Sequence, residues 1–319
     1  MVTLKIPAKD VKGFNYHPSY STGSLEDWIN FDAKVWENEL KNGKEKFPKM
    51  NTVRIWLSWN AYCRNENGFI KSVRTVIEIC KKLDLYVIPC LFNRWHDPMV
   101  DCDGIYIDHF LPGSSWLLKF GDPFTDYIEA IAKEFKDEEQ ILVFDICNEP
   151  FAYGNNFELK DIVEKYELEW LRRIADLLRK SGVTQPIGVG STGLEPMEIF
   201  DDFCDVYLTH LYYIGGPIEK FEGKVLSFVK EAQKNNKPLI CSECCWGSLD
   251  DKNRSELIKG TLSTFKKYGV GFVAHALQYC GCTDLHDITD GRLTENIGNL
   301  CFVNKDGSLR PYHEVFNEF

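Results

Sequence analysis

The sequence has no apolar run that could cross a membrane and no excess of positive charge. No stretch of its 319 residues approaches the roughly 20 consecutive apolar residues that a membrane-spanning helix needs. Lysine and arginine number 37 against 48 aspartates and glutamates, which gives a formal net charge of -11. A nucleic-acid backbone or an anionic membrane surface repels such a chain. We therefore expect neither as a partner, and no feature of the sequence indicates an oligomeric state.

Nucleotide-binding fingerprints, linkers and a leader pattern are also missing. Neither G-x-G-x-x-G nor G-x-x-x-x-G-K-[ST] follows an early strand pattern, and no Pro/Gly/Ser-rich linker or internal repeat divides the chain. The first residues, MVTLKIPAKD, lack the charged-then-apolar pattern of a secretory signal. We expect one domain over residues 1–319, no cofactor, and a cytoplasmic location, or a secreted one if a leader has been removed.

The cysteines are numerous, with 12 in the chain. Several lie inside apolar runs, where free thiols behave as small hydrophobic groups, and this favours a reducing compartment. The alternative is a metal site built from Cys241, Cys244 and Cys245 with Cys280 and Cys282. A structural zinc site usually has two well-separated C-x2-4-C pairs, whereas the first of these clusters interrupts an apolar strand pattern. We therefore predict no metal site.

Apolar runs of strand length recur along the chain with helical patterns between them. Most are nearly continuous in apolar residues, as parallel strands covered on both faces require. The predicted strands are 13–16, 52–59, 86–93, 141–148, 186–191, 206–213, 238–243 and 271–278, and the clearest amphipathic helices are 25–41, 70–83, 122–136, 159–180, 220–235 and 252–268. Strand followed by helix, repeated about eight times, predicts an α/β fold with a single (β/α)8 TIM barrel.

Polar and aromatic residues gather where the predicted strands end. Active sites in this fold lie at the C-terminal ends of the strands. Two glutamates hold such positions, since Glu149 follows the run ILVFDICN and Glu243 ends PLICSE. Cleavage of a glycosidic bond uses two carboxyl groups, one to protonate the leaving oxygen and one to attack the anomeric carbon or to activate water. A separation of about 5–5.5 Å would predict retention of configuration, and about 6.5–9.5 Å inversion.

The motifs around these glutamates resemble those of clan A glycoside hydrolases, most closely the family 5 cellulase/mannanase-like enzymes. N-E-P at 148–150 is similar to that family's acid/base motif, and S-E at 242–243 to its nucleophile motif. Arg54 is similar to the arginine that holds the nucleophile, and His210 with Tyr212 to the sixth-strand His-x-Tyr pair. The tail DGSLRPYHEVF at 306–316 also resembles the family's closing segment.

This resemblance implies a retaining β-glycoside hydrolase that cleaves β-linked glucan or mannan-type saccharides, with Glu149 as acid/base and Glu243 as nucleophile. Asn148 is expected to bind the sugar 2-hydroxyl, and Asp145 to be a buried partner of a polar group inside the barrel. The further substrate-binding candidates, which follow predicted strands, are Asn15, Arg54, Trp59, Trp95, His96, His210, Tyr212, Trp246 and Gln278.

One departure from the family pattern keeps a second hypothesis open. The family usually places a tryptophan at the end of the eighth strand, where this sequence offers His275, Gln278 or Tyr279. The alternative is a carbohydrate-binding barrel without catalytic activity.

Overall fold

The structure, a computed structural model, describes residues 3–94, 104–151, 158–193, 195–281 and 300–319. Parallel strands pair in sequence order and close into a barrel, which confirms the predicted TIM barrel. The strands are β1 (Lys12–Asn15), β2 (Thr52–Trp56), β3 (Tyr86–Asn93), β4 (Phe144–Asn148), β5 (Ile187–Ser191), β6 (Tyr207–His210), β7 (Leu239–Cys244) and β8 (Gly271–Ala274). Each lies within or overlaps one of the predicted runs.

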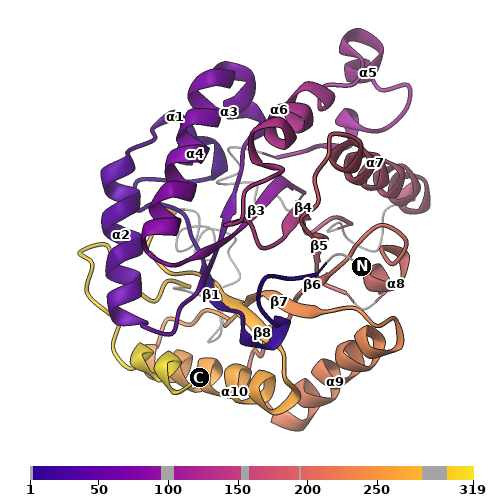
Figure 1. The fold of residues 1–319 in the computed structure, drawn as a ribbon. Helices are drawn as coiled ribbons and strands as arrows, with labels where there is room; N and C mark the ends of the chain where they lie inside the picture. Colours follow the sequence, from indigo (N-terminus) through magenta and orange to yellow (C-terminus); the bar gives the residue numbers. More distant parts are fainter. Residues whose placement is uncertain (1–2, 95–103, 152–157, 194, 282–299) are drawn as a thin grey trace.

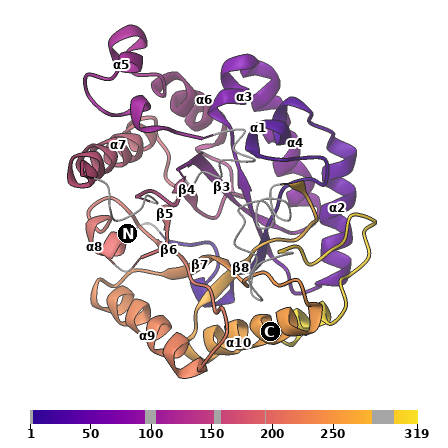
Figure 2. The same cartoon turned by 180° about the vertical axis from the view of Figure 1, so that it is seen from behind.

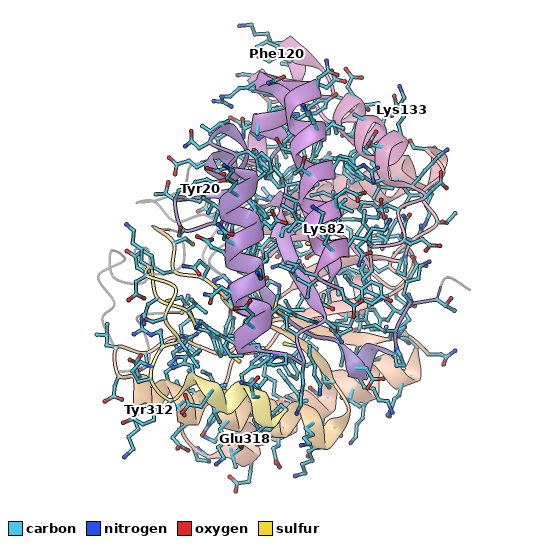
Figure 3. The ribbon with its side chains drawn as sticks, turned by 60° about the vertical axis from the view of Figure 1, so that its left-hand side comes forward. Tyr20, Lys82, Phe120, Lys133, Tyr312 and Glu318 are labelled. Carbon is cyan, nitrogen blue, oxygen red and sulfur yellow. The ribbon has the colours of Figure 1, made fainter. Side chains whose placement is uncertain are left out.

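Helices surround the barrel, as the two opposite views show (Figures 1 and 2). The α-helices are α1 (Ser24–Ile29), α2 (Ala33–Lys46), α3 (Trp59–Arg64), α4 (Glu66–Lys82), α5 (Ser115–Phe120), α6 (Thr125–Phe135), α7 (Lys160–Lys180), α8 (Glu195–Ile199), α9 (Ile218–Lys234) and α10 (Asp251–Tyr268). Short 3-10 helices are η1 (Ala8–Asp10), η2 (Ile107–His109) and η3 (His313–Glu318). Helices α2 and α4 lie side by side, and α5 carries Phe120 away from the barrel (Figure 3). Among the described residues, no helix combines the length and apolar character of a membrane span.

Capping residues explain two differences from the predicted elements. The expected helix 25–41 is divided into α1 and α2, because the Asp32 side chain accepts hydrogen bonds from the first amides of α2. The expected strand 52–59 ends at Trp56, because the side chain of Ser58 accepts a hydrogen bond from the Ala61 amide and begins α3. Trp59 therefore starts a helix instead of ending a strand.

The apolar core has two layers. The outer layer packs the strands against the helices and is rich in aromatic rings, such as Phe14 with Phe47 and Phe316. The inner layer fills the barrel with branched side chains and is closed by the N-terminal segment through Leu4 and Ile6. Its members are Val11, Ile88, Leu142, Val143, Val206, Leu208, Ile240 and Val273. Polar groups inside the barrel are therefore confined to the opposite end, where the strands terminate.

A β-bulge in β7 turns Glu243 toward the barrel interior. Side chains of a strand alternate between its faces, so the inward position of Ile240 would leave Glu243 outside. In the pairing with β6, however, Thr209 pairs with Cys241 and His210 with Glu243. One residue of β6 thus spans two of β7, and this extra residue reverses the alternation.

A similar irregularity occurs in β4. Asp145 pairs with Gly188 and Asn148 with Gly190, so three residues of β4 span two of β5. Both Asp145 and Asn148 face the interior as a result, where each accepts a hydrogen bond from the same arginine, Arg54. Strict alternation would have placed these two residues on opposite faces.

Strand β5 approaches the polar end of the interior so closely that Gly190 has no room for a side chain. A Cβ atom there would lie 2.9 Å from Oδ2 of Asp145, 2.9 Å from Nε2 of His210 and 3.1 Å from an Arg54 nitrogen. The amide of Gly190 also donates a hydrogen bond to Asp145 (2.9 Å). The glycine is therefore required by packing.

Gly190→Ala should destabilise the protein by about 1–3 kcal/mol, because the added methyl group displaces buried, hydrogen-bonded side chains. Gly223→Ala is the matched control. Gly223 lies inside α9 with no atom within 4 Å of an added Cβ, so alanine should stabilise that helix by up to about 1 kcal/mol. Thermal unfolding followed by circular dichroism measures both changes, and equal midpoints for the two variants would contradict the packing argument.

Candidate active site

The guanidinium of Arg54 lies at the centre of the polar cluster. Its Nε and Nη2 are 2.9 and 2.8 Å from Oδ2 of Asp145. Nη1 donates to Asn15 (3.0 Å) and to Glu243 (3.1 Å), and Nη2 donates to Asn148 (2.9 Å). The residue is fully buried. Burial opposes its charge, but the carboxylates of Asp145 and Glu243 more than offset this and hold the pKa of Arg54 above its usual value.

Glu243 accepts hydrogen bonds on both carboxyl oxygens. Oε2 receives the bond from Arg54, and Oε1 receives one from the Tyr212 hydroxyl at 2.5 Å. Burial, followed by the nearby charge of Glu243, raises the pKa of Tyr212 well above its ordinary value, so this hydroxyl keeps its proton and remains a donor. Glu243 therefore accepts a charge-assisted hydrogen bond from a cation on one oxygen and a hydrogen bond from a phenol on the other.

Glu149 has different surroundings, although it belongs to the same cluster. It follows β4 in the left-handed backbone region (φ 47°), which is uncommon for a residue other than glycine and turns the chain at the strand end. Burial raises the pKa of Glu149 to about 7, against a weaker opposing effect of Arg54. A side-chain hydrogen bond joins Oε1 of Glu149 to Nδ1 of His210 at 2.6 Å. The carboxyl group can therefore hold a proton near neutral pH.

His210 orients the carboxyl group of Glu149. Burial lowers the pKa of His210 to about 4, so the imidazole is neutral at pH 7. Its Nε2 is buried and has no hydrogen-bond partner among the described residues. An N–H is costlier to leave unpaired there than a lone pair, particularly with Arg54 close by, so we assign the proton to Nδ1. His210 then donates to Oε1 of Glu149 and leaves Oε2 to carry the exchangeable proton.

The two glutamates meet across the mouth of the barrel. One oxygen of Glu149, one oxygen of Glu243 and a ring nitrogen of His210 lie within 4.8 Å of one another. Glu149 follows β4 and Glu243 belongs to β7, as the sequence predicted. These atoms are also of the type that binds metal ions, but both oxygens of Glu243 already accept hydrogen bonds from Arg54 and Tyr212. The arrangement suits a carboxylic acid paired with a carboxylate.

Asn148 and Asn15 belong to the hydrogen-bond network around Arg54. Asn148 accepts from Arg54 and donates through Nδ2 to Oδ1 of Asn93 (2.9 Å), which leaves its second amide hydrogen for a ligand. Asn15 is completely buried and donates to the backbone carbonyl of Ser242 (3.0 Å). The structure therefore places Asn15 under the glutamates as a support, whereas the sequence predicted a substrate contact.

The predicted aromatic and amide candidates have different surroundings. Trp246 is partly exposed and packs edge-on against Tyr212, with ring centroids 4.9 Å apart. Trp59 is buried and packs against Phe124, and its indole donates to the Pro123 carbonyl. Gln278 is buried beyond the end of β8 and donates to the Asn304 carbonyl. Of these three, the structure brings only Trp246 to the glutamate pair. The predicted sites Trp95 and His96 lie outside the described residues.

Three further residues surround the site. Asn93, the last residue of β3, pairs with Asn148 in the sheet and fixes its amide. Asp145, predicted as a buried partner, is confirmed in that role by its contacts with Arg54. At the strand end where the family usually has a tryptophan, His275 follows β8 directly and contacts the ring of Trp56 edge-on.

Solved structures with the same fold include several carbohydrate-active enzymes. An exo-β-1,4-mannosidase from Opitutaceae bacterium strain TAV5 matches with a TM-score of 0.73 and 16% identity, covering 97% of this chain and 58% of that chain. A broad-specificity endoglucanase from Clostridium acetobutylicum matches with a TM-score of 0.68 and 16% identity, covering 98% and 99%. At such identities these similarities concern the fold alone.

Sequence comparison identifies the family. The chain is 26% identical over 345 aligned positions to endoglucanase A from Clostridium longisporum. This alignment covers 96% of the chain and 62% of the relative, so the chain spans less than two thirds of that protein's length. The family model for cellulase (glycosyl hydrolase family 5) matches residues 10–281. The chain therefore belongs to glycosyl hydrolase family 5.

Proposed function

We propose that the chain hydrolyses β-glycosides with retention of configuration, with Glu243 as nucleophile and Glu149 as general acid/base. The observation that carries the proposal is the pairing of two carboxyl groups in contrasting surroundings, with one oxygen of Glu149 and one oxygen of Glu243 within 4.8 Å of each other. An inverting pair of carboxyl groups stands about 6.5–9.5 Å apart to admit a water molecule, so this close approach of two oxygens supports direct attack by one carboxylate.

In the first step the glycosidic bond breaks and a covalent intermediate forms. Oε2 of Glu149 gives its proton to the leaving oxygen, while the carboxylate of Glu243 attacks the anomeric carbon from the opposite face. The hydrogen bonds from Arg54 and Tyr212 orient Glu243 for this attack. The free amide hydrogen of Asn148 is placed to bind the sugar 2-hydroxyl, a contact that strengthens in an oxocarbenium-like transition state.

In the second step water hydrolyses the intermediate. The ester at Glu243 is neutral, so Glu149 loses a negative neighbour and ionises more readily. It then removes a proton from water as the water oxygen attacks the anomeric carbon and the ester bond breaks. His210 stabilises ionised Glu149 through its Nδ1–H, and the released sugar keeps its original anomeric configuration.

The proposed substrates are β-linked glucan or mannan-type oligosaccharides and polysaccharides. An acidic chain of net charge -11 suits neutral sugars better than anionic ones. Among the similar proteins, one is named an endoglucanase and another an exo-β-1,4-mannosidase. Release of phenol from aryl β-glucosides and β-mannosides, with an NMR reading of the first-formed anomer, tests both the activity and the retention of configuration.

Replacing either glutamate should abolish or slow the reaction in different ways. Glu243→Ala removes the nucleophile and should lower kcat by at least about 10⁴-fold on every substrate. Glu149→Ala should lower kcat/KM by about 10²–10⁴-fold for poor leaving groups. Its effect should be much smaller for dinitrophenyl glycosides, whose leaving group needs no proton. Added azide should restore turnover in Glu149→Ala and give a glycosyl azide of retained configuration.

Glu222→Ala is the matched control for these variants. Glu222 lies on α9 and pairs with Lys267 on the outer helix layer, so its removal should leave the kinetics unchanged. Full activity of Glu243→Ala would refute the nucleophile assignment. A wild-type protein that binds oligosaccharides but releases no phenol would favour the inactive carbohydrate-binding barrel.

The rate should fall as pH rises through about 7. Glu149 must be protonated for the first step, and burial raises its pKa to about 7 in the folded protein, so the acid form is present below that pH and lost above it. We expect an alkaline limb near pH 7 in kcat/KM for aryl glycosides with poor leaving groups. The limb should be absent from the residual activity of Glu149→Gln on dinitrophenyl glycosides, and its persistence there would assign it to another group.

A further inference from the structure

The space around the glutamate pair is unequal on its two sides. Glu149 and Glu243 follow or belong to β4 and β7, so β5 and β6 separate them on one side and β8, β1, β2 and β3 on the other. The shorter side is occupied, because His210 contacts Glu149 and Tyr212 contacts Glu243. We therefore place a sugar ring attacked by Glu243 on the longer side, along the ends of β8, β1 and β2.

Among the described residues, three aromatic rings lie on this longer side. Trp56 lies two residues beyond Arg54 on the inward face of β2, and the Arg54 guanidinium lies 4.5 Å from its ring centroid. His17, two residues beyond β1, stacks on Trp56 with ring centroids 4.6 Å apart at 19°. His275 meets the same indole edge-on at 6.1 Å. These three rings form a wall that continues from the buried Arg54 network toward the C-terminal ends of the strands.

His17 is held rigidly on this wall. Its Nδ1 is 2.7 Å from Oδ2 of Asp27 in α1, and the Asp27 side chain is completely buried. The indole of Trp28, next along α1, donates to the backbone carbonyl of Trp56 and ties the helix to β2. The imidazole thus has one fixed orientation before any ligand binds, which reduces the entropy lost on binding.

The second ring nitrogen of His17, Nε2, is not the atom that Asp27 holds, and the side chain keeps 8% of its surface exposed. Burial disfavours the charged ring, but Asp27 raises the pKa of His17 from its ordinary value. Nε2 accepts a hydrogen bond in the neutral ring and donates one in the charged ring. A sugar hydroxyl can complement both states, because it both donates and accepts.

We propose that His17 determines substrate specificity by binding one hydroxyl of the sugar ring that Glu243 attacks, with Asp27 and Trp56 positioning the imidazole. This inference rests on the proposed function for the location of that sugar. The ligand class is a neutral glycosyl unit. Trp56 and Asp27 act through His17 and are positioning residues.

The test compares wild type with His17→Ala on aryl β-glycosides and on their monodeoxy analogues. His17→Ala should lower kcat/KM by about tenfold to hundredfold on the parent glycoside, the cost of a hydrogen bond to a polar or charged partner. One deoxy analogue should show the same loss with wild type and no further loss with His17→Ala. A merely structural role would lower the rate on every analogue alike, and that result would overturn the proposal.

Two variants guard against a folding artefact. His17→Gln keeps a nitrogen donor near the position of Nε2 and should restore part of the discrimination against that deoxy analogue. His313→Ala is the matched control, because His313 is a buried histidine bonded to Arg254 in the C-terminal segment. It should lower the unfolding temperature without changing the ratio between parent and deoxy substrates. A changed ratio in His313→Ala would also count against the proposal.

Calorimetric titration with β-1,4-linked glucose and mannose disaccharides separates this inference from the proposed activity. Binding that weakens about tenfold or more in His17→Ala, in a protein that releases no phenol, would support the sugar contact and refute catalysis. An active enzyme whose binding and deoxy-sugar discrimination are unchanged in His17→Ala would support catalysis and refute the contact. Failure of the wild type to bind either disaccharide would overturn the inference.

Discussion

The site depends on one buried cation. The guanidinium of Arg54 is fully enclosed and donates from all three nitrogens to groups on β1, β4 and β7. A buried charge is costly unless it is paired and hydrogen-bonded, and removing one partner of such a pair leaves the other uncompensated, at a cost of about 3–5 kcal/mol. The strand ends must therefore keep the geometry that satisfies Arg54. That requirement holds Asn148 and Glu243 in place before substrate arrives.

Irregularities in the backbone of β4 and β7 place the side chains that form hydrogen bonds with this cation. Regular alternation would turn Glu243 out of the barrel and set Asn148 on the face opposite Asp145. The extra residues in β4 and β7 reverse the alternation at the end of the barrel that carries the polar side chains. Gly190 completes the fit from β5, since any larger residue would press on Asp145 and His210. The apolar lower half of the barrel follows the regular pattern, and its polar upper half departs from it.

This contrast explains what the sequence could predict. The apolar runs predicted all eight strands and hence the barrel, and the N-E-P and S-E motifs located the glutamate pair at strand ends. The position of Trp59 at the start of a helix could not be predicted from hydrophobicity, because the helix cap at Ser58 ends the strand early. Gln278 lay in an apolar run whose strand pairing ends at Ala274. The Asp27–His17 pair was equally hidden, since an aspartate in an amphipathic helix normally faces solvent, whereas this one is buried.

In the proposed mechanism the two glutamates have different roles because their surroundings differ over a few ångströms. Glu243 receives a cation and a phenol, while Glu149 is buried with a neutral imidazole as its hydrogen-bond partner. Nδ1 of His210 also lies 3.7 Å from Oε2 of Glu243, so the imidazole is close to both carboxyl groups. Esterification of Glu243 would remove an anion from this confined space and so favour ionisation of Glu149. In the proposed mechanism the change of Glu149 from acid to base follows from the loss of this negative neighbour, against the constant effect of burial on its pKa.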